Sequence, residues 1–200
     1  MTNNICIDDF LADDSIQNKE RRIIIVLESP HVNEFEIGGN PIPAIGATGY
    51  ALENKFSEIF DNYLKSKDSD IRFDDGYYHV FIMNAIEYQC SLGFSTSRYR
   101  DIVFKSLWEQ NEIIDSFSSR LSKYNPIITI SLCTKGNKTN FKKIALDSFD
   151  YCKDKKLTMR NMVINEIVSN SDLNQEHKII RGCHPSSWNR RKAFRKFQKI

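Results

Sequence analysis

Short apolar runs that alternate with segments of helical periodicity constrain the fold of this chain more than any other feature. The runs have the length and composition of buried strands and occupy residues 23–26, 78–83, 127–132 and 179–180. Apolar residues recur at helical spacing over residues 49–65 and 100–123. Strands that alternate with helices indicate a parallel sheet covered on both faces. We therefore expect an α/β protein, a three-layer α/β/α fold with a central, mainly parallel four-stranded sheet.

Two further elements are expected in the second half of the chain. Residues 140–148 follow a Gly-containing turn and are predicted to form a helix. Residues 151–176 are charged and irregular, and the apolar triplet Met162-Val163-Ile164 within them is interpreted as a short strand.

Length and composition favour one domain. Two hundred residues with 40% hydrophobic content supply one core, so residues 1–200 are expected to form a single domain, with residues 1–20 as a polar N-terminal arm.

The five cysteines are widely spaced and include no C-x-x-C pair, which predicts reduced thiols, no metal site and no cofactor. The sequence shows no leader pattern and no apolar run of membrane-spanning length. We expect a cytoplasmic monomer that does not associate with membranes.

The net charge of +2 conceals a basic C-terminal tail. No acidic residue follows Glu176, whereas the chain beyond it contains Lys178, Arg181, Arg190, Arg191, Lys192, Arg195, Lys196 and Lys199. Such a segment suits a polyanionic partner, although it is equally compatible with the solvated face of a terminal helix.

Polar residues that carry chemistry follow the first and last apolar runs. Leu27-Glu28-Ser29-Pro30-His31 comes directly after the first run, and His184-Pro185-Ser186-Ser187-Trp188 comes shortly after the last. In an open α/β sheet these positions lie at the carboxyl edge, where ligands bind. We expect the Glu28 carboxylate and the His184 imidazole to form one reaction site from both ends of the chain.

Four segments, taken in order, resemble motifs of the uracil-DNA glycosylase superfamily. They are Leu27-Glu28-Ser29-Pro30-His31-x-x-Glu34, Gly39-Asn40-Pro41 with Gly46-x-x-Gly49-x-x-Leu52, a strand ending at Asn84, and His184-Pro185-Ser186. The likeness is strongest to the bacterial and archaeal branches whose motifs are Gly-Glu-Ala-Pro-Gly-x-x-Glu-Asp and His-Pro-Ser, and it covers residues 25–195. It implies a DNA glycosylase, a hydrolase that flips out a damaged or modified pyrimidine and cleaves its N-glycosidic bond to leave an abasic site.

The resemblance also implies roles for individual residues. Glu28 would orient the attacking water, Asn84 would recognise the flipped base, and His184 would donate a hydrogen bond to the departing base. The remaining base-binding positions would be Ser29, Pro30, His31, Ala44 and Ile45. DNA, the expected partner, would be contacted by Ser186, Ser187, Trp188, Arg190, Arg191 and Lys192.

Within that set, Trp188 is expected to act as the wedge that fills the space left by the extruded nucleotide. Each role has a structural alternative. Glu28 could be a surface acid, Asn84 a turn residue and His184 a loop histidine. Trp188 could be a core aromatic.

The chain departs from the family pattern around the base pocket. Ser29 stands where the best-known uracil enzymes have an Asp, and Leu27 and His31 replace glycines. The loop over residues 41–46 is two residues longer and lacks the aromatic that usually stacks on uracil. A wider pocket favours a bulkier modified pyrimidine, so base-excision repair of uracil and defence against phage DNA with modified bases both remain open.

Two other classes of function fit the same sequence. One is a catalytically inactive superfamily member that acts as a nucleic-acid-binding or protein-interaction module. The other is a nucleotide-handling α/β protein of unrelated chemistry, because fold does not determine function.

Overall fold

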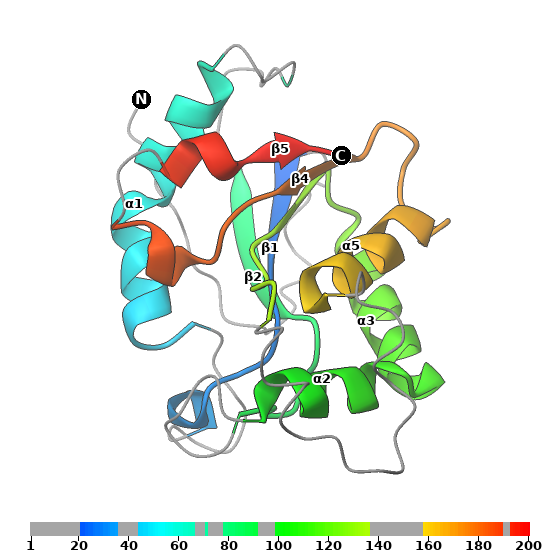
Figure 1. The fold of residues 1–200 in the computed structure, drawn as a ribbon. Helices are drawn as coiled ribbons and strands as arrows, with labels where there is room; N and C mark the ends of the chain where they lie inside the picture. Colours follow the sequence, from blue (N-terminus) through cyan, green and yellow to red (C-terminus); the bar gives the residue numbers. More distant parts are fainter. Residues whose placement is uncertain are drawn as a thin grey trace.

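The computed structural model describes residues 21–35, 44–66, 71, 78–91, 99–136, 158–189 and 193–200. They form an α/β structure around a five-stranded, mostly parallel sheet with strand order β2-β1-β3-β4-β5 (Figure 1). The strands are β1 (Arg22–Leu27), β2 (His79–Asn84), β3 (Ile128–Ser131), β4 (Lys178–Arg181) and β5 (Gln198–Lys199). The four expected strands are present, and β1, β2, β3 and β4 pair in parallel.

The prediction of four strands is wrong by one. Strand β5 pairs antiparallel with β4, with Ile180 opposite Lys199 and Arg181 opposite Gln198. A strand of two exposed residues carries no hydrophobic alternation, so its pairing depends on where the chain returns to the sheet.

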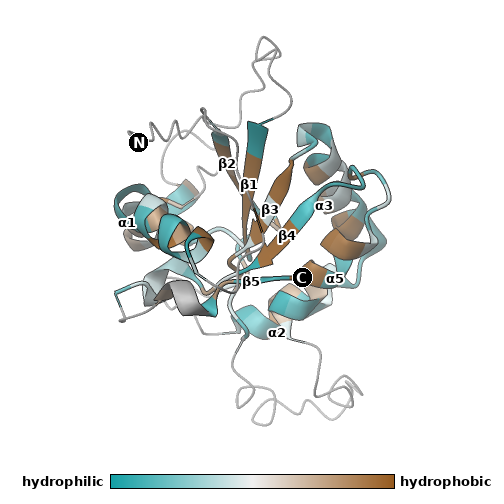
Figure 2. Cartoon of the chain, turned by 90° about the horizontal axis from the view of Figure 1, so that it is seen from above, coloured by the Kyte–Doolittle hydropathy of each residue, from teal (hydrophilic) through white to brown (hydrophobic). Residues whose placement is uncertain are grey.

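Helices cover both faces of the sheet, as a three-layer arrangement requires (Figure 2). Ile23, Ile25 and Leu27 of β1 belong to the cluster that contains α1 (Ala47–Leu64) and the C-terminal segment. Ile24 and Val26 point to the other face and belong to the cluster that contains three helices, α2 (Arg100–Trp108), α3 (Asn111–Tyr124) and α5 (Met159–Ser169). None of the helices in these described ranges is long and apolar enough to cross a membrane.

The single helix expected over residues 100–123 is two helices. The chain turns between α2 and α3, and Trp108 at the end of α2 packs on two rings. Its ring centroid lies 5.4 Å from that of Phe104 and 5.3 Å from that of Phe117. No Gly or Pro marks the turn, so neither of the usual helix-breaking residues indicates the break in the sequence.

The strand expected at Met162-Val163-Ile164 is also wrong, because these residues lie in α5. Thr158 caps this helix by accepting a hydrogen bond of 3.2 Å from the backbone N–H of Asn161. Met159, Met162, Val163 and Ile167 are buried on one side, which is helical spacing. The expected helix over residues 140–148 and the arm over residues 1–20 lie outside the described residues.

The parallel strands bring their carboxyl ends to one edge of the sheet. Hydrogen bonds continue the pairing beyond the strands, from Ala85 N to Leu27 O at 2.8 Å and from Gly182 N to Ser131 O at 2.9 Å. A side chain at the second of these positions would be crowded, because a Cβ on Gly182 would lie 2.5 Å from Cδ2 of Leu132 and 3.0 Å from the ring of Phe197. The residues that follow β1, β2, β3 and β4 therefore converge at this edge.

Candidate functional site

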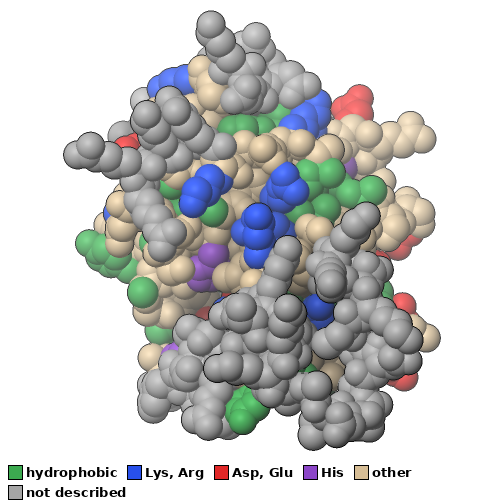
Figure 3. Space-filling view, in the orientation of Figure 1, with side chains coloured by type: hydrophobic (Ala, Val, Ile, Leu, Met, Phe, Trp, Pro, Cys, Tyr) green, Lys and Arg blue, Asp and Glu red, His purple; other side chains and the backbone are tan. Residues whose placement is uncertain are grey.

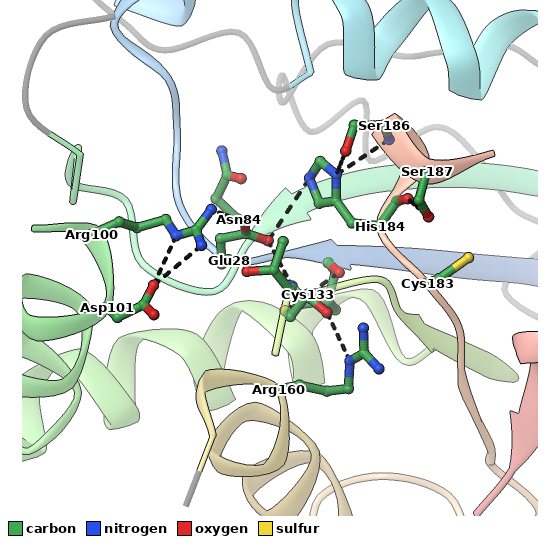
Figure 4. A network of polar contacts seen from close by, with 12 residues as sticks. Glu28, Asn84, Arg100, Asp101, Cys133, Arg160, Cys183, His184, Ser186 and Ser187 are labelled. Carbon is green, nitrogen blue, oxygen red and sulfur yellow. Dashed lines mark hydrogen bonds and ion pairs between the residues drawn. The ribbon is translucent and has the colours of Figure 1, made fainter. Parts of the chain in front are cut away.

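The carboxylate of Glu28 lies at the centre of the carboxyl edge. Glu28 follows β1 directly and is buried. Its Oε2 accepts a hydrogen bond of 3.2 Å from the backbone N–H of Thr134, which follows β3, and lies 3.9 Å from Nε2 of His184, which follows β4. Its Oε1 lies 3.4 Å from Nη1 of Arg100, the first residue of α2 (Figure 4). Groups from three distant parts of the sequence thus meet on one carboxylate, as the strand-end pattern predicts for Glu28 and His184.

The local turn determines which nitrogen of His184 carries the proton. The backbone N–H of Ser186 donates to Nδ1 at 3.3 Å, and Oγ of Ser186 lies 2.9 Å from the same atom. Both groups belong to the 3-10 turn Pro185–Ser187, and Ser187 Oγ donates to the His184 carbonyl at 2.8 Å. Since Nδ1 accepts, the neutral ring carries its proton on Nε2, which faces Glu28.

Burial lowers the pKa of His184, and the Arg100 and Arg160 guanidiniums add to this effect, whereas the Glu28 carboxylate opposes it by raising the pKa. The imidazole is therefore neutral near pH 7, with an Nε2–H donor directed at the centre of the site. A neutral donor at that place can stabilise negative charge that develops on a bound group.

Arg100 is held at the site by a second acid. Its Nε lies 3.2 Å from Oδ1 of Asp101, which is buried. Gly136 allows this arrangement, because its φ is 85° and a Cβ there would lie 2.7 Å from Oδ2 of Asp101. The first turn of α2 therefore lies close against Gly136, in the loop that follows β3.

Arg160, in the first turn of α5, provides a second guanidinium nearby. Its Nε donates to the carbonyl of Cys133 at 2.8 Å (Figure 4). Lysine and arginine side chains gather in the middle of one face of the molecule, close to a histidine (Figure 3). Neither arginine was predicted as a site residue from the sequence. Arg100 was predicted only as the start of a helix. For Arg160 the available signal was the helical spacing of Met159, Met162 and Val163, which places it in the first turn of a helix.

A second polar group lies beside this centre, at the end of β2. Asn84 is buried, and its Nδ2 donates to Oε2 of Glu34 at 3.2 Å. Its Oδ1 is buried without a hydrogen-bond partner among the described residues. Glu34 lies in the 3-10 turn Val32–Phe35, is 5% exposed, and also accepts hydrogen bonds from the backbone of His31 and Ala44. Burial raises the pKa of Glu34 to about 6, against the lowering effect of these hydrogen bonds.

Glu34 was part of the quoted sequence motif but was given no role. The sequence around Glu34 does not indicate that its carboxylate is buried. Only its fixed spacing from Glu28 in the motif could have suggested a role. The structure connects it to three of the predicted base-binding residues, Asn84, Ala44 and His31.

The other predicted base-binding residues occupy the two loops that flank this group. Ser29 and His31 are half-buried and Pro30 is buried in the loop after β1, where the Ser29 side chain forms a hydrogen bond with the Cys90 thiol. Ala44 is buried with a left-handed φ of 63°, and Ile45 is half-buried beside it.

The predicted DNA-binding residues have different outcomes. Ser186 is exposed and Ser187 is half-buried, each within the turn that orients His184. Arg190, Arg191 and Lys192 lie outside the described residues.

The prediction that Trp188 is a protruding wedge is wrong. Its side chain is 4% exposed, and its Nε1–H donates to the carbonyl of Cys183 at 2.9 Å. The ring lies 6.4 Å from Phe56 of α1 and 6.3 Å from Phe197, centroid to centroid. The aromatic face of α1 is covered by this indole, so Trp188 is a core residue.

The described residues contain no group of three or more His, Cys, Asp or Glu side chains that could hold a metal ion. Cys90, Cys133 and Cys183 are free and buried. The side chains that meet at the described site are a carboxylate, a neutral imidazole, two guanidiniums and an amide.

No protein-family model, curated protein or solved structure matches this chain.

Proposed function

We propose that this protein is a DNA glycosylase that flips out a modified or damaged pyrimidine and hydrolyses its N-glycosidic bond. The observation that carries the proposal is the convergence of Glu28 and His184 at 3.9 Å. These are the two residues to which the resemblance to the uracil-DNA glycosylase superfamily assigns the reaction. Asn84, the residue expected to recognise the base, ends the strand next to β1. The fold class is also that expected for such an enzyme.

The geometry supports a hydrolytic mechanism. A water molecule attacks C1′ of the deoxyribose, the C1′–N bond breaks, and its electron pair remains on the base. Glu28 orients this water and accepts its proton. The Nε2–H of His184 donates to the base where negative charge accumulates, and a donor in such a position is worth about 10²–10³ in rate.

The pocket residues support a proposal about which base is removed. Ala44 and Ile45 provide aliphatic side chains where uracil enzymes usually place an aromatic ring. We propose that a pyrimidine with a bulky substituent is the preferred substrate and that plain uracil is a poor one. Repair and defence against phage DNA with modified bases are both compatible with this chemistry.

The test is the release of bases from DNAs of differing base content, measured as the formation of abasic sites. We expect release from at least one DNA with modified pyrimidines. Glu28→Gln and His184→Ala should each reduce that release by about a hundredfold or more. His177→Gln serves as the matched histidine control, because His177 precedes β4 and lies at the opposite edge of the sheet. Glu53→Gln, on the exposed side of α1, serves as the matched acid control.

One observation favours a second candidate, a superfamily member that binds DNA without cleaving it. Both carboxylate oxygens of Glu28 already face protein groups, Oε1 facing Arg100 and Oε2 facing Thr134 and His184. Ser29 also provides no second acid. Binding of DNA by the wild type with no base release from any substrate would replace the glycosylase by this binding module. If the control variants lose as much activity as the Glu28 and His184 variants, the assignment of the site is wrong.

A further inference from the structure

We propose that Glu34 is a positioning residue that fixes the orientation of the Asn84 amide and thereby determines which hydrogen-bonding edge of a base the pocket accepts. The inference rests on the proposed function, because it takes Asn84 as the residue that recognises the base. It goes beyond that function by assigning the specificity to a carboxylate that does not itself touch the reacting atoms.

Glu34 lies between the loops of the pocket and contacts each of them. Its carboxylate accepts from Asn84 Nδ2 at 3.2 Å, at the end of β2. It also accepts from the backbone of Ala44, which has a φ of 63°, and from the backbone of His31. A single buried group therefore connects the three segments that carry the expected base contacts.

The side-chain oxygen of Asn84 has no hydrogen-bond partner among the described residues. Because Nδ2 donates to Glu34, the amide is oriented with Oδ1 turned away from that carboxylate. This Oδ1 is buried without a partner among the described residues. A buried acceptor without a partner is rare in proteins and calls for a donor from a ligand or an ordered water.

The free acceptor on Asn84 and its fixed orientation determine which hydrogen-bonding edge of a base fits the pocket. A pyrimidine whose ring nitrogen carries a proton between two carbonyl groups offers an N–H donor to Oδ1. A 4-aminopyrimidine has an acceptor at that ring nitrogen and leaves Oδ1 unpaired. With Glu34 ionised, the pocket is expected to favour the 2,4-dioxo form, whatever substituent the ring carries at its fifth position.

Protonation of Glu34 would reverse this preference. A protonated carboxyl group can donate to Asn84 Oδ1, so that the amide turns over and presents Nδ2 to the base. Glu28 at the end of β1 is the charged side chain that acts on Glu34 and disfavours its ionised form. From the adjoining segments, Asn84 of β2 and the backbone N–H groups of His31 and Ala44 favour the ionised form. The pKa of Glu34, raised to about 6, places the change within an accessible pH range.

The first test uses the protein without DNA and measures the NMR resonances of the Asn84 side-chain amide between pH 4.5 and 7.5. Its resonances are identified by their loss in Asn84→Asp. We expect them to move with a midpoint near 6 in the wild type, the value to which the pKa of Glu34 is raised, and to be independent of pH in Glu34→Gln. The internal control is the side-chain amide of Asn54, which lies on the exposed face of α1 and donates to the Tyr50 carbonyl. Asn84 resonances that do not move through pH 6 in the wild type, or that still move in Glu34→Gln, overturn the proposal. The wild-type titration decides this point even if Glu34→Gln does not fold.

The second test compares two probes that differ at the recognised edge. Oligonucleotides with 5-hydroxymethyl-2′-deoxyuridine or 5-hydroxymethyl-2′-deoxycytidine are bound at pH 7.5 to the wild type and to Glu34→Gln. We expect the wild type to prefer the uridine by about tenfold, the scale of one specific hydrogen-bonded contact to a base, and the variant to lose this preference. An equal preference in both proteins overturns the assignment of specificity to Glu34.

The two proposals fail in different ways. A wild type whose Asn84 amide titrates as expected, but which releases no base from any DNA, contradicts the glycosylase and supports the positioning role. Base release that depends on Glu28 and His184, with an Asn84 amide that is insensitive to Glu34, supports the glycosylase and contradicts the positioning role.

Discussion

Replacement of Trp188 distinguishes a core residue from an exposed wedge. The Trp188→Ala substitution removes a buried indole from between Phe56 and Phe197 and leaves a cavity beneath α1. Truncation of a buried Trp to Ala costs about 3–5 kcal/mol. The substitution also leaves the carbonyl of Cys183 without its donor, which adds a penalty of about 1–3 kcal/mol if water does not replace it.

The expected effect on thermal stability follows from the size of the chain. For a domain of about this length, each 1 kcal/mol lowers Tm by about 2–4 °C. The cavity cost of Trp188→Ala thus corresponds to a decrease of roughly 6–20 °C. Trp188→Phe keeps a ring in the stack and loses the Nε1–H, so its destabilisation should be smaller, about 1–3 kcal/mol.

The measurement is urea and thermal unfolding followed by far-UV circular dichroism. Tryptophan fluorescence is unsuitable, because the substitution removes one of the two tryptophans. Tyr50→Ala is the matched control, since Tyr50 is an aromatic residue that is 67% exposed, and its effect should stay within about 0.5 kcal/mol. If Trp188→Ala unfolds like the wild type while DNA binding weakens, the indole is a surface contact and the core assignment is refuted.

Two further substitutions test the sheet and its edge. Burial lowers the pKa of His177 to about 4 from its ordinary value of 6.5, so the unfolded chain binds a proton that the folded protein does not. The free energy of unfolding should therefore fall as the pH decreases from about 6.5 to about 4. In urea titrations at several pH values, the fall should be smaller for His177→Gln than for the wild type. If both proteins lose stability equally as the pH decreases, His177 is not responsible. Gly182→Ala places a Cβ 2.5 Å from Leu132 Cδ2. It should destabilise the fold by about 1–3 kcal/mol in the same urea assay. If its stability equals that of the wild type, the C-terminal segment can shift away from the sheet.

The apolar runs of the sequence predicted the four parallel strands, and the polar residues that follow those strands predicted that Glu28 and His184 lie close together. Runs such as residues 23–26 and 127–132 are apolar at every position, as expected of strands covered on both faces, and they form β1 and β3. Once those strands are parallel, the residues that follow them must meet at one edge, which is why Glu28 and His184 could be paired from the sequence alone.

Packing between distant segments decided the remaining features. Trp188 has the same local sequence whether it projects into solvent or covers α1, and only the position of Phe56 and Phe197 buries it. Arg100 and Glu34 likewise find their partners on other segments of the chain, Glu28 for the first and Asn84 for the second. Hydrophobic periodicity reports which face of an element is buried, but it carries no information on which polar side chains from separate elements come within hydrogen-bonding distance. Those contacts are set when the layers pack, so the tertiary structure alone determines them.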